Sequence, residues 1–197
     1  WGLGRDSLWH DESWTWGLAQ EGPANTLWYL LRMDAHPPLS YIFLHYLMKV
    51  SQSVIWIRLY FVIFGIWVCC LLYLIAREYL DEIAARLAML LAVFSPLLIF
   101  ASQYVRSYID SAFWMLLASL FLLRIVKGKD SLINWIGYAA SAIISLYTFY
   151  GSILLIAAQA IYITVFNIKN IKVMLKWYLV FFLLFLAFLP WVPVMLK

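Results

Sequence analysis

Residues 57–77 read IRLYFVIFGIWVCCLLYLIAR, an apolar stretch whose charged side chains, Arg58 and Arg77, stand at or next to its two ends. A helix needs about 20 consecutive apolar residues to cross the hydrocarbon core of a bilayer. Lipid offers no hydrogen-bond partners to backbone groups, so such a segment crosses as a helix that satisfies its own amides and carbonyls. The stretch therefore predicts a membrane-spanning helix and an all-α fold.

The composition of the whole chain agrees with a membrane protein. Of the 197 residues, 66% are hydrophobic and 12% are charged, and the mean hydropathy is +0.88. Soluble domains are about half apolar and a quarter charged, so a water-soluble fold and a disordered chain are excluded. The net charge of +4 is small and scattered, which indicates no nucleic-acid partner. The adjacent Cys69 and Cys70 are expected to be apolar packing residues.

Further apolar segments predict a polytopic bundle of about six spans. They lie at roughly 57–77, 83–101, 107–126, 132–149, 152–168 and 175–195. Breaks are expected between Pro96 and Ser102, over 127–130 and at 150–152, where proline, glycine and charged residues gather. We expect residues 1–56 to form an outer loop with the site motifs and 57–197 to form the transmembrane bundle. A preceding helix and a C-terminal domain are expected to lie outside this sequence.

The first 36 residues mix charged side chains with tryptophan and tyrosine, and none of their apolar runs is long enough to span a bilayer. Such a mixture is typical of amphipathic helices that lie in the membrane interface. Gly22-Pro23 predicts a break between two of them. The outer loop is therefore expected to hold two short interfacial helices.

Basic residues in short loops indicate which side of the membrane each loop faces. The loops near 77–86, 124–130 and 167–176 carry the larger basic share: Arg77, Arg86, Arg124, Lys127, Lys129, Lys169, Lys172 and Lys176. We expect these loops to be cytoplasmic. All three histidines and most acidic residues then fall on the opposite side, so we expect the chemistry on the extracytoplasmic face of the plasma membrane, or of the endoplasmic reticulum in a eukaryote.

Two motifs of the outer loop carry candidate chemistry. Asp11-Glu12 is a carboxylate pair within an aromatic segment, where one acid can act as a base or metal ligand while the other braces the loop. The alternative is a solvated pair without a role. His36-Pro37-Pro38 fixes the backbone directly after an imidazole, which suits a ligand or hydrogen-bond donor. The alternative is a histidine at a helix start without chemistry.

Arg106 is the third candidate, at the outer start of a predicted span. A guanidinium near a bilayer boundary can hold a lipid phosphate through two hydrogen bonds. Asp110 follows four residues later, one turn into the span. The alternative role for Arg106 is therefore an internal ion pair with Asp110.

The ordered set of motifs resembles the GT-C glycosyltransferases that use lipid-linked sugars, in particular protein O-mannosyltransferases and aminoarabinose transferases. The features that match occur in this order: Asp11-Glu12, His36-Pro37-Pro38-Leu39-Ser40-Tyr41, Ile57-Arg58-Leu59, Ser95-Pro96, residues 102–108 (SQYVRSY) and residues 146–150 (LYTFY). The sequence departs from the family where an acid often precedes the arginine and where a histidine often stands in place of Phe149.

The resemblance implies transfer of a sugar from a polyprenyl-phosphate donor, with inversion, to an acceptor that is a protein, a lipid or a glycan. The site residues it implies are Asp11 and Glu12 for catalysis; Arg106, Tyr108 and Arg58 for the donor phosphate; and His36, Gln103, Asp110, Tyr147 and Tyr150 as supporting groups. A divalent metal ion held by Asp11 and His36 is the one cofactor that remains open.

Two other classes of protein compete with a glycosyltransferase. A transporter would be expected to carry charge near mid-span and to consist of similar halves, whereas Asp110 is the deepest charged residue here and no internal repeat is visible. A non-catalytic scaffold would share the fold without the chemistry, yet Asp11, His36 and Arg106 are all present. Sugar turnover separates the enzyme from the scaffold.

Overall fold

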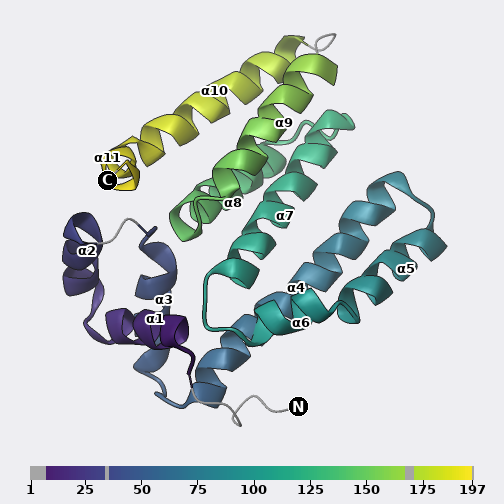
Figure 1. The fold of residues 1–197 in the computed structure, drawn as a ribbon. Helices are drawn as coiled ribbons and strands as arrows, with labels where there is room; N and C mark the ends of the chain where they lie inside the picture. The colour runs from purple at the N-terminus through teal and green to yellow at the C-terminus, as the bar shows by residue number, and fades with distance from the viewer. Residues whose placement is uncertain (1–7, 34–35, 167–170, 197) are drawn as a thin grey trace.

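The computed structural model describes residues 8–33, 36–166 and 171–196 (Figure 1). Every regular element within these ranges is helical. The apolar part consists of α4 (Val54–Tyr79), α5 (Glu82–Val93), α6 (Pro96–Gln103), α7 (Tyr108–Val126), α8 (Leu132–Thr148), α9 (Ser152–Phe166) and α10 (Ile171–Phe188), followed by η1 (Leu189–Trp191) and α11 (Val192–Met195). The all-α membrane bundle predicted from the sequence is confirmed.

Three helical segments are long and apolar enough to cross a membrane, namely Val54–Tyr79, Tyr108–Val126 and Ile171–Met195. Large apolar side chains on their outer surfaces are exposed; Trp67 of α4, for example, is 56% exposed. In water these surfaces would be costly, whereas lipid accommodates them. Two of the other expected spans, α8 and α9, form apolar helices of 17 and 15 residues, shorter than the usual length of a span.

The segment expected to span over 83–101 is broken. Helices α5 and α6 meet at a bend of 54° and together make one broken span or a re-entrant loop. The break lies at Phe94–Ser95, not within 96–102 as the proline suggested, because Pro96 occupies the first turn of α6, where it costs no hydrogen bond. The Ser95 hydroxyl caps this turn by accepting from the Leu98 amide at 3.5 Å.

Helix α6 lies directly against α4 at a glycine. A Cβ atom at Gly65 would stand 2.1 Å from the Ser102 Oγ and 2.9 Å from the Ser102 Cβ, so only glycine permits this approach. The contact brings the C-terminal end of α6 close to α4. The next residues, 104–107, form the loop that carries Arg106 into α7.

The basic loops gather at one end of the bundle (Figure 1). Glu78, near the end of α4, lies 3.3 Å from the Lys127 Nζ and 3.6 Å from the Lys129 Nζ, both in the α7–α8 connection. Asp130 of the same connection pairs with Lys176 of α10 at 2.6 Å. Residues 167–170, which include Lys169 of the third expected cytoplasmic loop, lie outside the described residues.

Three short helices lie at the opposite end of the bundle, beside the start of α4 (Figure 1). They are α1 (His10–Gln20), α2 (Pro23–Arg32) and α3 (Leu39–Met48). Gly22 has a φ of 86° and makes the turn between α1 and α2 at the predicted break. The Thr26 hydroxyl donates to the Leu18 carbonyl at 2.7 Å and joins α2 to α1. The His45 Nδ1 lies 2.7 Å from the Ala19 carbonyl and joins α3 to α1.

Candidate functional site

Glu12 joins three separate parts of the chain at the α1 end of the bundle. Its Oε1 accepts from the Val105 amide at 2.9 Å, and its Oε2 accepts from the Trp9 amide at 3.0 Å and from the Arg58 Nη2 at 3.2 Å. The side chains of Glu12 and Arg58 are only 1% and 6% exposed. A buried carboxylate is stable only when donors and a cation replace its water. Glu12 therefore fixes α1 against α4 and against the loop before α7.

This geometry changes the roles expected for two residues. The resemblance seen in the motifs implies a catalytic role for Glu12 and a donor-phosphate contact for Arg58, whereas the structure buries both side chains and pairs them with each other. With only 6% of its side chain exposed, Arg58 is not open to a phosphate in this structure. We therefore assign both residues to positioning the site. Glu12 and Arg58 are 46 residues apart, and the sequence signal for their pairing is opposite charge among apolar neighbours.

Asp11, the neighbour of Glu12, has the opposite environment. Its side chain is exposed, and its Oδ2 accepts from the Tyr104 hydroxyl at 3.5 Å. Partial burial and then the carboxylates of Asp11 and Glu12 raise the pKa of Tyr104, which keeps this hydroxyl protonated and able to donate. Adjacent residues of a helix point about 100° apart. That angle explains how one acid is buried while the other stays open to a ligand.

Arg106 lies beside α1 rather than beside Asp110. Its Nη1 donates to the Thr15 hydroxyl at 3.2 Å, and Thr15 in turn donates to the Asp11 carbonyl at 3.0 Å. Arg106 and Thr15 line a narrow pocket together with His36. The loop before α7, with Arg106 in it, thus reaches the helix that carries Asp11. The structure brings Asp11, His36 and Arg106 to the same end of the bundle.

Asp110 is buried, and within the described residues no ion pair joins it to Arg106. Its Oδ2 accepts from the Ser40 hydroxyl at 3.0 Å and its Oδ1 from the Ser111 amide at 2.9 Å. The internal ion pair considered from sequence fails because α7 begins at Tyr108, so Arg106 is outside the helix and the four-residue spacing does not place it above Asp110. Asp110 instead fastens the start of α3 to α7.

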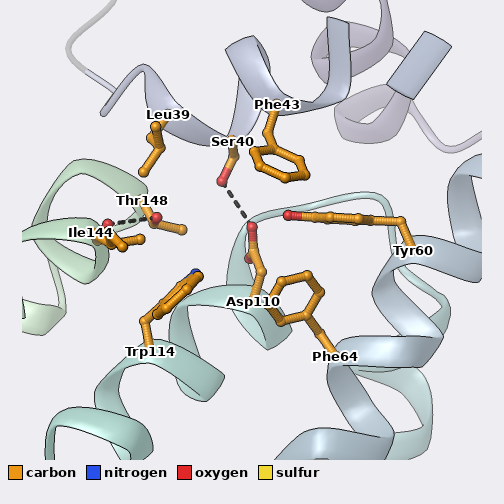
Figure 2. Close-up of a pocket in the computed structure, with 9 residues that line it drawn as sticks. All are labelled: Leu39, Ser40, Phe43, Tyr60, Phe64, Asp110, Trp114, Ile144 and Thr148. Atoms are coloured by element: carbon orange, nitrogen blue, oxygen red, sulfur yellow. Dashed lines mark hydrogen bonds between the residues drawn. The ribbon is translucent and has the colours of Figure 1, made fainter. Parts of the chain in front are cut away.

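A cavity of about 290 Å³ lies next to the Ser40–Asp110 hydrogen bond (Figure 2). Its walls come from four helices, and Figure 2 shows the Tyr60 hydroxyl directed at Asp110 from the α4 side. Most of the wall is apolar, with rings from Phe43, Phe64 and Trp114. Ser40 and Thr148 line both this cavity and the narrow pocket of Arg106. The polar pocket and the apolar cavity are therefore neighbours.

Tyr108 lies at the border of the site. Its ring is 43% exposed, stacks on the Tyr104 ring with centroids 6.2 Å apart, and meets the Phe149 ring edge-on at 5.8 Å. This aromatic row extends from the hydroxyl that contacts Asp11 to the end of α8. Tyr108 is thus available to a ligand beside Arg106.

Three predicted supporting residues lie elsewhere in the bundle. Gln103 lines a separate cavity between α4, α5 and α6. The Tyr147 hydroxyl donates to the Ala187 carbonyl at 2.8 Å, and the Tyr150 hydroxyl accepts from the Trp191 indole at 2.9 Å. Tyr147 therefore joins the end of α8 to the C-terminal end of α10, and Tyr150, just after α8, is joined to η1. The structure also places Thr15 and Ser40 in the site. Ser40 is part of the His36–Tyr41 motif but had no role assigned to it, and Thr15 carried no sequence signal.

The family model described as dolichyl-phosphate-mannose-protein mannosyltransferase matches residues 35–193. The chain belongs to this mannosyltransferase family. Membership implies glycosyltransferase activity and supports the resemblance seen in the motifs. No curated protein and no solved structure matches the chain.

The match to the mannosyltransferase family covers only part of the candidate site. It includes His36, Arg106 and Asp110 and begins after α1 and α2. The roles of Asp11 and Glu12 therefore rest on the geometry described above and on the resemblance in the motifs. Both lines of argument point to the same end of the bundle.

Asp11 and His36 would supply two ligands to the divalent metal ion that the sequence leaves open. Among residues 8–33, 36–166 and 171–196, no group of three or more histidine, cysteine, aspartate or glutamate side chains gathers as a metal site. Two protein ligands alone do not make the three- or four-ligand set of a tightly bound catalytic metal. The metal stays a prediction, and no step below depends on it.

Proposed function

We propose that this chain is a multi-pass membrane glycosyltransferase that moves a sugar from a polyprenyl-phosphate donor to an acceptor hydroxyl or amine, with inversion. The reaction would take place at the end of the bundle formed by α1–α3, on the extracytoplasmic face. The observation that carries this proposal is the Asp11–Thr15–Arg106 arrangement. It holds Arg106 against the helix that carries the exposed Asp11, because Arg106 donates to the Thr15 hydroxyl and Thr15 donates to the backbone carbonyl of Asp11. The Asp11 carboxylate itself accepts from Tyr104, two residues before Arg106.

Each residue has a defined part in the proposed reaction. The acceptor oxygen or nitrogen forms a bond to the anomeric carbon while the bond from that carbon to the phosphate oxygen breaks. The electron pair of the broken bond leaves with the polyprenyl phosphate, and Arg106 stabilises the negative charge that develops there. The acceptor proton passes to Asp11. Attack from the side opposite the phosphate inverts the anomeric centre.

The two neighbouring cavities suit the two parts of such a donor. The pocket with Arg106 and His36 carries side chains that can bind a phosphate, but its volume is only about 10 Å³, so these side chains would have to move apart to admit one. The cavity beside Ser40 is walled by aromatic and aliphatic groups and suits the first isoprene units of the lipid. Thr148 and Ser40 border both spaces, so a donor could extend from one to the other past the hydroxyl that donates to Asp110.

The test of this function is turnover by the purified protein in nanodiscs, with dolichyl-phosphate mannose as the donor and membranes of the producing cell as the acceptor. We expect release of dolichyl phosphate and a new glycosidic bond of opposite anomeric configuration, identified by NMR. Retention of configuration would contradict single displacement. Donor binding without any transfer would favour the non-catalytic scaffold, and movement of the donor across the bilayer without transfer would favour a transporter.

A further inference from the structure

A further cavity lies between helices α1 and α2. It has a volume of about 560 Å³ and is referred to below as the α1–α2 groove. Its walls combine aromatic and polar side chains: Ser13, Trp14, Gly17, Leu18, Gln20, Glu21, Asn25, Trp28 and Tyr29. The volume falls within the range of about 300–1,000 Å³ usual for small-molecule sites. None of the roles assigned above uses this groove.

The groove offers two kinds of contact side by side. Trp14 and Trp28 are 43% and 55% exposed, and Trp14 is held by an edge-on contact with the Tyr29 ring at 5.7 Å. Gln20 and Asn25 offer amides that both donate and accept hydrogen bonds, and Glu21 offers a carboxylate that accepts. A sugar ring presents an apolar C–H face and a rim of hydroxyls, which match flat aromatic surfaces and amide or carboxylate groups, respectively.

A role for these tryptophans as anchors at the lipid–water boundary would account for fewer of the groove's side chains than carbohydrate binding does. Tryptophans alone would suit the lipid–water boundary, but here an acid and two amides share the same cavity. Placing these groups in lipid would remove their water without replacing it. Water, and a ligand rich in hydroxyls, satisfy both kinds of group.

The groove also lies on the helix that carries the proposed base. Trp14 is three residues after Asp11, about one turn along α1. We propose that the α1–α2 groove binds carbohydrate, as the part of a glycan-bearing acceptor that extends beyond the hydroxyl to be glycosylated. This inference rests on the proposed function for its link to Asp11, whereas carbohydrate binding itself can be measured without turnover.

Gly17 allows the groove to be filled without disturbing the fold. A Cβ atom at Gly17 would meet nothing within 4 Å, and the residue lies within α1, where glycine is a poor helix former. Gly17→Leu should therefore obstruct the groove and preserve the helix. Gly17→Ala is the matched control, because it makes the same improvement in helix propensity and adds only one methyl group.

The experiment is saturation-transfer NMR of the chain in phosphatidylcholine nanodiscs with mannotetraose, cellotetraose and maltotetraose as probes. Maltoside detergents are avoided because their head group resembles the probes. We expect at least one tetrasaccharide to bind saturably. Gly17→Leu should weaken binding about tenfold, the equivalent of one or two lost hydrogen bonds, while Gly17→Ala stays within about twofold of the wild type. Asn25→Ala, at the opposite wall, should also weaken binding.

Several results would overturn the inference. They are no binding of any tetrasaccharide, equal binding by the wild type and Gly17→Leu, and saturable binding of a serine- and threonine-rich peptide in place of the sugars. The outcome is separable from the proposed function. Loss of turnover in Asp11→Asn together with an unaffected Gly17→Leu would end the carbohydrate groove and leave the glycosyltransferase in place, whereas tetrasaccharide binding without any donor turnover would do the reverse.

Discussion

Glu12→Gln is predicted to act mainly by lowering the free energy of unfolding, although the change only replaces one oxygen by an NH₂ group of similar size. The wild-type carboxylate accepts three hydrogen bonds, two on Oε2 and one on Oε1, and is 1% exposed. In the amide, the NH₂ group faces a donor in either orientation: the Val105 amide if it takes the place of Oε1, or the Trp9 amide and the Arg58 guanidinium if it takes the place of Oε2. Breaking one side of a buried ion pair costs about 3–5 kcal/mol.

The assay is thermal unfolding in nanodiscs, with Asp11→Asn as the matched control. The control removes the same charge one residue earlier, but from an exposed side chain, so we expect its Tm to stay near that of the wild type. A loss of 3–5 kcal/mol corresponds to a drop of about 6–20 °C for a chain of this length. Glu12→Gln combined with Arg58→Met should recover part of the loss. Equal Tm values for Glu12→Gln and Asp11→Asn would refute the reasoning.

Three further predictions follow from single contacts. Arg106→Lys should lower turnover roughly 10- to 150-fold, because a point charge replaces a two-pronged contact worth about 1.5–3 kcal/mol with a charged ligand; near-normal turnover would remove Arg106 from catalysis. Gly65→Ala should lower the Tm through overlap with Ser102, at a cost of about 1–3 kcal/mol, whereas Gly17→Ala should not. Hydrogen bonds from a lysine of α10 and an indole of α8 lower the pKa of Asp130. Its ion pair should therefore stabilise the fold fully above the ordinary pKa of about 3.9 and lose that effect as the pH falls through the lowered value. Asp130→Asn should lack this contribution to the fall of Tm in acid.

The helices could be predicted because lipid leaves the backbone few choices. The stretch at 57–77 is part of Val54–Tyr79, and Gly22-Pro23 separates α1 from α2 as expected. The bend between α5 and α6 could not be predicted in the same way. A proline fits the first turn of a helix as well as it breaks one, and the close approach of Gly65 to Ser102 depends on a partner 37 residues away.

The site could be predicted in its residue types better than in its partnerships. Asp11, His36 and Arg106 were selected from the sequence and lie at one end of the bundle. The partners of the buried charges were missed: Asp110 is bound by Ser40 rather than by Arg106, and Arg58 pairs with Glu12, a contact that the sequence analysis did not propose. Spacing along a helix suggests local pairs, whereas these contacts are made between helices and depend on tertiary packing.

The measurement that tests the central claim most directly is donor turnover by the wild type and by Asp11→Asn, with donor affinity determined in parallel. Asparagine keeps the size and the contact with Tyr104 but cannot accept a proton. We predict that dolichyl-phosphate release falls by about 100-fold or more, the usual effect of losing a general base, while donor affinity changes little because Arg106 and the apolar cavity are intact. Full turnover in Asp11→Asn would contradict the account.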